Sequence, residues 1–351
     1  MIPFYSFKHI HDSIEDQLIE SSIKTIKSGN YVFGTTRFEE EFADYVGSKY
    51  CAAVANGTAA IHLSLLALGI QEGDEVITVS HTFRATVAAI KYCGAIPIYV
   101  DIRNDTFVID HNSLESKITD KTKCIIPVHI YGNVAAMKEI KRIADKYNIP
   151  IVEDCSQAHG SKIHDQHVGT FGTLGTFSFY PGKGLGALGD AGCVVTNDEN
   201  LYKFITKMRQ WDDNAIGYNY RMSNIQAEFL RIKLKNFDTI VFEKRQIADE
   251  YNKHFPYVKC DTGVFHSYHV YPILVSERDK FIEILKPQVE TKSHYNIPVH
   301  RLTCYRSSVS LPITEKISNH EVSLPIYPGV DSKKVITHIE NILNDNTCSL
   351  L

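Results

Sequence analysis

A single lysine stands among turn residues in the middle of the chain. Residues 175–190 read Gly-Thr-Phe-Ser-Phe-Tyr-Pro-Gly-Lys-Gly-Leu-Gly-Ala-Leu-Gly-Asp, so a β-rich run ends at Tyr180 and a Pro-Gly turn presents Lys183. In such a constricted, partly desolvated turn a lysine has a lowered pKa and acts as a nucleophile toward carbonyl carbons. The alternative is an ordinary solvated loop lysine.

An acidic residue ends another apolar run, Ile149-Pro-Ile-Val-Glu-Asp154. A carboxylate at the carboxyl edge of a buried strand needs a partner that offsets its desolvation. The protonated ring nitrogen of pyridoxal phosphate (PLP) would be such a partner, and this pairing keeps PLP an effective electron sink. The alternative is that Asp154 caps the turn that follows.

The tripeptide Asn56-Gly57-Thr58 joins a predicted strand to a predicted helix. Backbone N–H groups in the first turn of a helix are unpaired and lie at its positive end, which suits a phosphate group. Gly57 lets an anion approach the main chain, Thr58 adds a hydroxyl donor, and Ser178 is placed to reach the same phosphate. The alternative is a plain helix N-cap, for which Asn and Thr are favoured with or without a ligand.

Two further patterns have competing interpretations. Phe83 follows a predicted strand, where it either stacks on a flat cofactor ring or packs in the core. Residues 184–189 satisfy the G-x-G-x-x-G spacing of dinucleotide-binding proteins. That fingerprint must open a helix, whereas here the glycines lead into Gly192-Cys-Val-Val-Thr, which is typical of a strand. The dehydrogenase interpretation is therefore rejected.

The elements that must position these side chains predict an α/β fold. Strands and helices alternate from about residue 50 to 210, and near-continuous Val/Ile runs indicate strands covered on both faces. We expect a large domain over 1–220, with a mainly parallel sheet between helices, and a smaller C-terminal α+β domain over 221–351. The predicted strands are 50–55, 75–79, 96–100, 124–129, 150–153 and 268–275, and the predicted helices are 58–68, 83–93, 134–147, one or two within 221–254, 278–285 and 333–344.

Composition narrows the function classes. The 351 residues carry a formal charge of −4 and no Lys/Arg-rich run, which argues against nucleic-acid binding. No signal peptide and no run of about 18 apolar residues is visible, so a membrane protein is not expected. The eight cysteines are scattered without a C-x-x-C pair, which favours reduced thiols in the cytoplasm over a disulfide framework or a metal site.

Taken together, the motifs resemble those of the DegT-type (DegT/DnrJ/StrS) nucleotide-sugar aminotransferases, which have the PLP fold-type-I architecture. The most specific is SFYPGKGLGALGDAG at 178–192, which resembles the family's lysine motif. Further matching segments, in the family's order and spacing, are SGNYVFG at 28–34, NGTAAIHLSLLALG at 56–69, GDEVITVSHTF at 73–83, PVHIYG at 127–132, EDCSQAHG at 153–160 and GYNYRMSNIQAE at 217–228.

The resemblance implies a role for each matching residue. Lys183 would hold PLP covalently and shuttle a proton, and Asp154 would pair with the pyridine nitrogen. Gln157 would lie near the phenolic oxygen of the ring, and Phe83 would stack on it. Gly57, Thr58 and Ser178 would bind the phosphate. Asn219 would reach the phosphate of the neighbouring subunit, so that a homodimer is needed for a complete site.

The resemblance also implies the substrates. Glutamate would donate the amino group to a nucleotide-linked 3- or 4-keto-6-deoxyhexose, giving an amino sugar for lipopolysaccharide O-antigen or a similar glycan. His294, Tyr295 and His300 lie in a segment that resembles a substrate-side segment of the family. Some relatives replace the lysine by histidine and act as dehydratases, and Lys183 therefore favours amino transfer. The alternatives are a PLP-dependent sugar dehydratase or aldolase, and a non-catalytic regulator with the same fold.

Overall fold

The computed structural model describes residues 1–211, 216–256, 258–345 and 347–351. Its centre is a sheet in the order β3-β2-β4-β5-β8-β9-β1, in which parallel bridges from Ile125 to Ile151 and from Val128 to Asp154 join β4 to β5. Only β9 runs antiparallel to its neighbours, so the expectation of a mainly parallel sheet is confirmed. The strands are β1 (Tyr50–Val54), β2 (Glu75–Val79), β3 (Ile96–Val100), β4 (Thr122–Ile125), β5 (Val152–Asp154), β8 (Leu174–Ser178) and β9 (Gly192–Thr196).

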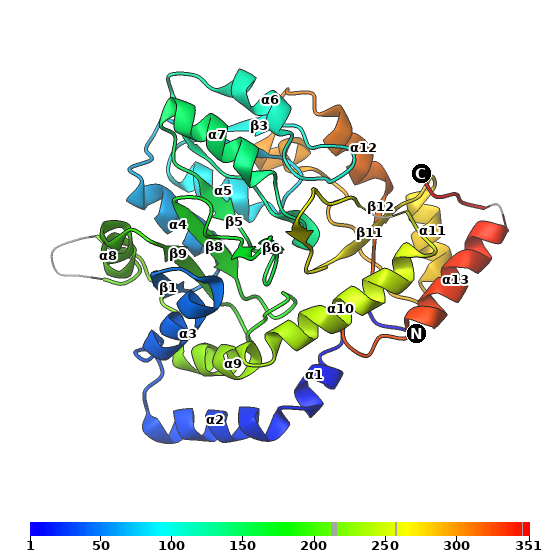
Figure 1. Ribbon diagram of the computed structural model, residues 1–351, viewed down its shortest axis with the longest axis horizontal. Coiled ribbons are helices and arrows are strands. Elements are labelled where there is room, and N and C mark those ends of the chain that lie inside the picture. The colour runs from blue at the N-terminus through cyan, green and yellow to red at the C-terminus, as the bar shows by residue number, and fades with distance from the viewer. Residues whose placement is uncertain (212–215, 257, 346) are drawn as a thin grey trace.

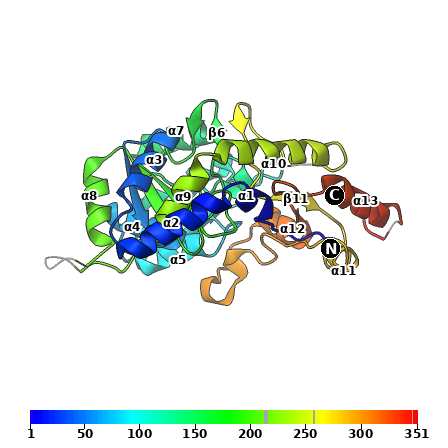
Figure 2. The ribbon, with the colours of Figure 1, turned by 90° about the horizontal axis from the view of Figure 1, so that it is seen from below.

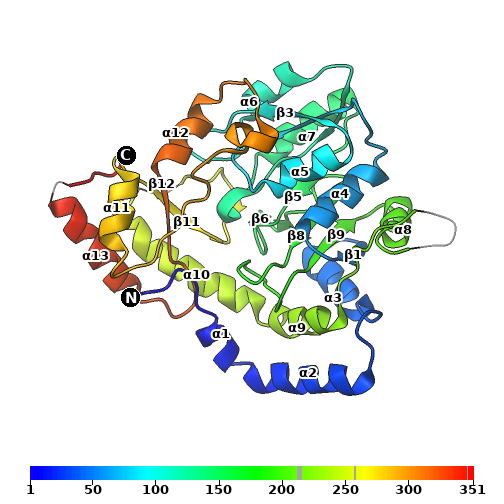
Figure 3. The same ribbon diagram turned by 180° about the vertical axis from the view of Figure 1, so that it is seen from behind.

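Both faces of this sheet are buried, and alternation along each strand divides the side chains between two cores. In β2, Ile77 and Val79 face the core under α3 and α7, whereas Val76 faces the core under α4 and α5. Figure 1 shows the first pair of helices in front of the sheet, and Figure 3 shows the second pair from behind. The helices on this body are α3 (Thr36–Val46), α4 (Gly57–Ala67), α5 (Ala85–Tyr92), α6 (His111–Leu114), α7 (Met137–Tyr147) and α8 (Glu199–Met208).

A third core lies at the C-terminal end of the chain. The antiparallel pair β11 (Tyr271–Leu274) and β12 (Glu321–Leu324) packs with α11 (Arg278–Leu285) and α13 (Ser332–Asn344). The long helix α10 (Phe237–Asn252) follows α9 (Asn224–Leu234) and runs from the central body to this core (Figure 1). The remaining elements are α12 (Pro312–His320), the short strands β6 (Lys162–Ile163), β7 (Gln166–His167) and β10 (Val264–Phe265), and the single-turn 3-10 helices η1 (Glu115–Lys117), η2 (Ile130–Gly132), η3 (Val299–Arg301) and η4 (Thr303–Tyr305).

The N-terminal segment spans both parts. Ile2 pairs with Val289, so the first residues lie against the C-terminal part. The helices α1 (Lys8–Asp12) and α2 (Glu15–Ser28) then cross back under the molecule, and Leu18 packs against Phe229 of α9 (Figure 2). The division of the chain at residues 220 and 221 stays a prediction. Within the part of the chain that the structure describes, no helix is both long and apolar enough to cross a membrane.

Two helices begin later in the chain than predicted. The helix expected over 134–147 begins at Met137. The Asn133 amide donates to the carbonyl oxygens of Thr106 and Lys259 at 3.0 and 2.9 Å, and the backbone of Asn133 is extended ahead of the helix. The helix expected from residue 83 begins at Ala85, which leaves Phe83 in the connecting segment.

Candidate active site

A cavity of about 530 Å³ opens beyond the carboxyl ends of the central strands, where open parallel sheets bind ligands. Segments that follow β1, β2, β5 and β8 line it, together with residues from the N-terminal segment and from the C-terminal part. The structure brings together at this cavity nine of the residues singled out in the sequence, namely Gly57, Thr58, Phe83, Asp154, Gln157, Ser178, Lys183, His294 and Tyr295.

Lys183 lies in a turn that helix α9 holds in place. The turn is closed by a hydrogen bond from the Lys183 N–H to the carbonyl oxygen of Tyr180 at 2.8 Å. From α9, Gln226 Oε1 accepts the Gly189 N–H at 3.0 Å, and Lys233 Nζ donates to the Gly186 carbonyl oxygen at 2.6 Å. Burial lowers the pKa of Lys183 to about 8, and the Asp154 carboxylate opposes part of that shift. The lysine is thus an anchored, partly buried amine and not a solvated loop residue.

Asp154 is 5% exposed at the end of β5. Thr86 Oγ1 donates to its Oδ2 at 2.8 Å, and the Ser156 N–H donates to its Oδ1 at 3.1 Å. The carboxylate therefore does cap the turn that follows. Because each carboxylate oxygen accepts more than one hydrogen bond, Asp154 still has acceptor capacity toward the cavity that it lines.

The junction between β1 and α4 combines a helix cap with a cradle. Asn56 Oδ1 accepts the Ala59 N–H at 2.9 Å, so the plain N-cap interpretation is correct for Asn56. Gly57 has a separate role, because a Cβ built on it would lie 2.7 Å from Ser178 Cβ and 3.3 Å from Ser156 Oγ. Only glycine leaves the end of the α4 backbone open toward the cavity at this point.

The Phe83 ring is 48% exposed, so it does not pack in the core. Its centroid lies 6.1 Å from that of Tyr295, with 41° between the ring planes, and both rings line the cavity. An apolar ring held at the wall of a cavity offers a surface for a flat ligand.

The hydrogen bonds of Gln157 orient its amide. Its Oε1 accepts the backbone N–H of Tyr131 at 2.9 Å, and since a backbone N–H only donates, this atom must be the oxygen. Its Nε2 donates to the Tyr295 hydroxyl at 2.8 Å. The amide NH₂ group of Gln157 has a second proton, which leaves a donor for an acceptor on a bound ligand.

β12 holds the segment that carries His294 and Tyr295 through two bonds to His294. The His294 N–H donates to Glu321 Oε2 at 2.6 Å, and its Nδ1 lies 2.8 Å from Ser323 Oγ. Burial is the main cause that lowers the pKa of His294 to about 3, so the ring is neutral at physiological pH.

Two predicted residues lie away from the cavity lining. His300 is fully buried, with Nδ1 2.6 Å from Ser80 Oγ and Nε2 3.2 Å from Glu315 Oε1. It fastens the segment after Tyr295 to the end of β2. Asn219 is exposed, and its Oδ1 accepts a hydrogen bond from Arg221 at 2.9 Å. The substrate-side role of His300 stays a prediction. So does the phosphate-binding role of Asn219, which requires a second subunit.

Sequence reasoning gave no role to several residues at the cavity: Tyr5, Thr82, Thr86, Tyr180, Asp190 and His269. Thr86 had a signal, because it is a polar residue on the buried face of an otherwise apolar helix, one turn after Phe83. Tyr5 and His269 had none, since they are far apart in the sequence and only the tertiary fold brings them to the cavity.

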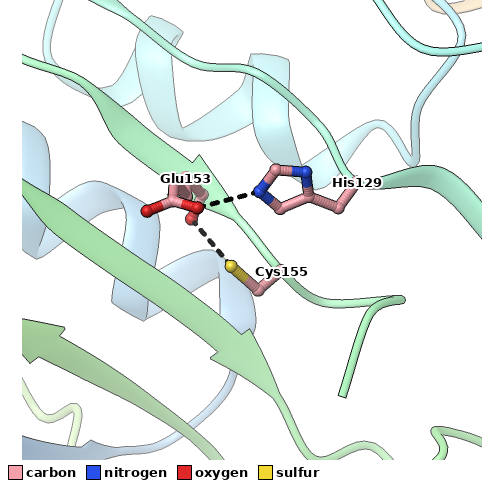
Figure 4. A group of neighbouring side chains, drawn as sticks. All are labelled: His129, Glu153 and Cys155. Atoms are coloured by element: carbon pink, nitrogen blue, oxygen red, sulfur yellow. Dashed lines mark hydrogen bonds and ion pairs between the residues drawn. The ribbon is translucent and has the colours of Figure 1, made fainter. Parts of the chain in front are cut away.

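A group of potential metal ligands, His129, Glu153 and Cys155, lies buried at the end of β5, where Glu153 and Cys155 flank Asp154 in the sequence (Figure 4). His129 Nε2 donates to Glu153 Oε2 at 3.0 Å, and His129 Nδ1 accepts the Ala135 N–H at 3.1 Å. The Glu153 carboxylate also accepts three backbone N–H groups at 2.7–2.9 Å, from Gly169, Phe171 and Gly172. Both the imidazole and the carboxylate are occupied by these bonds, so the group serves as a structural hub beneath the site.

The cavity fits PLP in four respects. Lys183 supplies an amine of lowered pKa, and Asp154 supplies a buried acceptor for a ring N–H. Gly57 opens a helix N-terminus to a phosphate, and Phe83 presents an exposed ring. An amine, an acid, an anion cradle and a stacking surface around one cavity define a protein that holds an aldehyde cofactor for amino-group chemistry.

Comparisons with known proteins place the chain more closely. The model of the DegT/DnrJ/EryC1/StrS aminotransferase family matches residues 12–343, and the chain belongs to this family. It is 40% identical over 331 residues to GDP-perosamine synthase from Escherichia coli O157:H7, covering 90% of each chain. It is 35% identical over 337 residues to dTDP-3-amino-3,4,6-trideoxy-alpha-D-glucose transaminase from Micromonospora megalomicea subsp. nigra, covering 89% of this chain and 90% of that one.

Solved structures agree. DesV from S. venezuelae, in complex with a ketimine intermediate, has a TM-score of 0.93 and 31% identity, covering 97% of this chain and 98% of that one. Ntda from Bacillus subtilis, solved with bound cofactor PMP, has a TM-score of 0.87 and 29% identity, covering 95% and 82%. These relationships confirm the fold, the enzyme class and the type of cofactor that the sequence predicted.

Proposed function

We propose that this enzyme uses PLP to move an amino group from glutamate to a nucleotide-linked 3- or 4-keto-6-deoxyhexose. One observation carries the proposal: an anchored lysine with a lowered pKa shares a cavity with a buried aspartate, at the edge where open parallel sheets bind ligands. The keto sugar is supported by relatives whose names specify GDP-perosamine and dTDP-3-amino sugars.

Each residue at the cavity contributes one interaction. PLP, when bound, supplies an electron sink that makes the bond from the donor's α-carbon to its hydrogen acidic. Asp154 would accept the ring N–H, the open end of α4 at Gly57 and Thr58 would bind the phosphate together with Ser178, and Gln157 would donate its second amide proton. Lys183 Nζ would hold the cofactor and then take up and return a proton, which a pKa of about 8 permits near neutral pH.

The proposal includes a homodimer that completes the cavity. Asn219 is exposed on the surface of a single subunit. The apolar side chains of Tyr31, Val32 and Phe33 are 53, 39 and 72% exposed, which is typical of a surface that a partner covers. In the assembled enzyme Asn219 would reach the phosphate in the neighbouring subunit.

The proposed location is the cytoplasm, where nucleotide sugars for surface polysaccharide such as lipopolysaccharide O-antigen are built. All eight cysteines are free thiols, and six of them are buried. A reducing compartment keeps such thiols free.

Incubation with ¹⁵N-labelled glutamate and a panel of 3-keto and 4-keto nucleotide sugars tests the proposal. We expect the label on one sugar carbon, read by NMR, and no label with Lys183→Ala. Loss of water or cleavage of the sugar without label transfer would favour the dehydratase or aldolase alternative. No change in any sugar with PLP firmly bound would favour the non-catalytic regulator.

A further inference from the structure

A closed ring of hydrogen bonds links the cofactor side of the cavity to its substrate side. The Tyr131 N–H donates to Gln157 Oε1 at 2.9 Å, and Gln157 Nε2 donates to the Tyr295 hydroxyl at 2.8 Å. Tyr295 follows His294, whose carbonyl oxygen accepts the Tyr131 hydroxyl proton. We infer that Tyr131 is a positioning residue, which holds Gln157 through its main chain and the segment 294–295 through its side chain.

The backbone of Tyr131 supports this role. Its φ of 61° and ψ of 1° lie in the left-handed region, which a tyrosine adopts only when its surroundings enforce it. The side chain is fully buried. Tyr131 does not itself line the cavity, but its costly conformation directs the N–H to Gln157 and the hydroxyl to the segment 294–295, both of which line it. This indicates that the conformation is used.

The hydroxyl of Tyr131 has a fixed direction. His81 Nε2 lies 2.8 Å from it, and burial lowers the pKa of His81 to about 4, so the imidazole is neutral. Since the single tyrosine proton goes to the carbonyl oxygen of His294, His81 Nε2 must carry the donated proton of its own bond. The chain of donors therefore runs in one direction, from His81 through Tyr131 to His294.

From the opposite side, Glu321 accepts the His294 N–H at 2.6 Å. The peptide unit before Tyr295 and the one before His294 are thus fixed by two different parts of the fold, with Tyr131 as the link to the cofactor side. Loss of the Tyr131 hydroxyl frees the His294 carbonyl oxygen but leaves the backbone bond to Gln157 intact. Tyr131→Phe is therefore expected to disturb the substrate side and to spare cofactor binding.

Tyr251 provides a matched control. It is also a fully buried tyrosine whose hydroxyl donates to a backbone carbonyl oxygen, that of Pro325 at 2.9 Å. It lies in the C-terminal core, and Pro325, unlike His294, does not line the cavity. Tyr251→Phe removes the same chemical group and the same kind of bond. A general loss of packing or hydrogen bonding would affect both variants alike.

The inference rests on the proposed function, and its test has one arm that does not. In the apoenzyme, hydrogen exchange read by mass spectrometry is expected to be roughly tenfold faster for the peptide covering 291–298 in Tyr131→Phe, and unchanged there in Tyr251→Phe. With substrates, Tyr131→Phe should raise KM for the keto sugar roughly tenfold, while the affinities for PLP and glutamate stay within about twofold of wild type.

Unchanged exchange at 291–298 in Tyr131→Phe would overturn the inference. So would an equal loss of PLP, glutamate and sugar binding, which indicates a general structural role. If exchange changes as expected but wild-type enzyme aminates no keto sugar in the panel, the ring of hydrogen bonds stands and the proposed function fails. These two failures are therefore distinguishable.

Discussion

Replacing Gly57 by alanine adds one carbon atom, the Cβ, at the predicted phosphate site, and so tests whether this site needs glycine. The new Cβ would lie 2.7 Å from Ser178 Cβ, well inside the distance that two carbon atoms tolerate. Either the first turn of α4 or the end of β8 must move. Overpacking of this kind costs about 1–3 kcal/mol of stability.

The same movement displaces the groups that would bind the phosphate. Losing one hydrogen bond to a charged group costs about 1.5–3 kcal/mol, which corresponds to a roughly tenfold to hundredfold weaker affinity for PLP. Titration of apoenzyme with PLP, followed by absorbance, measures this affinity, and thermal unfolding of the apoenzyme measures the stability separately.

Gly184→Ala is the matched control beside Lys183. A Cβ on Gly184 would meet Phe237 Cζ at 3.6 Å and His159 Cβ at 3.7 Å, which is ordinary contact. This variant should bind PLP as the wild type does. If Gly57→Ala binds PLP with unchanged affinity, or if both variants lose affinity equally, the reasoning about the cradle is wrong.

Three further predictions concern titration and charge. Capture of PLP by apoenzyme needs the neutral Lys183 amine, so the rate of capture should rise with pH toward about 8 and level off above it. Between about 8 and the ordinary lysine pKa of 10.5 the unfolded chain binds the proton more tightly than the folded one. The apoenzyme should therefore become more stable as pH rises from about 8 to 10.5. A rate that does not vary with pH would contradict the pKa. Asp154→Asn should lower the pH midpoint of PLP capture, since the Asp154 carboxylate raises the pKa of Lys183. It should also slow amino transfer about a hundredfold or more in a stopped-flow assay with glutamate. An unchanged midpoint would contradict the electrostatic effect of Asp154 on Lys183. Glu153→Gln places an amide NH₂ against converging donors and should cost about 3 kcal/mol in denaturant unfolding, whereas a chelator should leave wild-type activity unchanged; chelator-sensitive activity would instead indicate a metal at this hub.

Much of the central sheet is predictable because short apolar runs between turn residues are stable only as buried strands. Glu75–Val79 and Ile96–Val100 are short apolar runs between turn residues, and the structure places strands at those same bounds. The direction of β9 is not predictable in this way. Gly192–Thr196 has the same composition whether it runs parallel or antiparallel, and its direction follows from the return of the chain after the Lys183 turn.

Some residues of the site are likewise predictable from the sequence, and others are not. Residues at or shortly after strand ends, such as Asp154 and Gly57, converge on the cavity because parallel strands end at one edge of the sheet. His300 is only five residues after Tyr295, yet η3 turns it toward Ser80 and away from the cavity lining. Such a turn depends on tertiary partners, as does the role of Tyr131, whose left-handed backbone has no glycine to signal it.

Borohydride reduction of the holoenzyme, followed by proteolysis and peptide mass mapping, addresses the covalent attachment on which the account depends. We expect a purified yellow protein in which reduction fixes one pyridoxyl group per chain, on the peptide that contains Lys183. A colourless protein that takes up no PLP, or a pyridoxyl group fixed to a different lysine, would contradict the account.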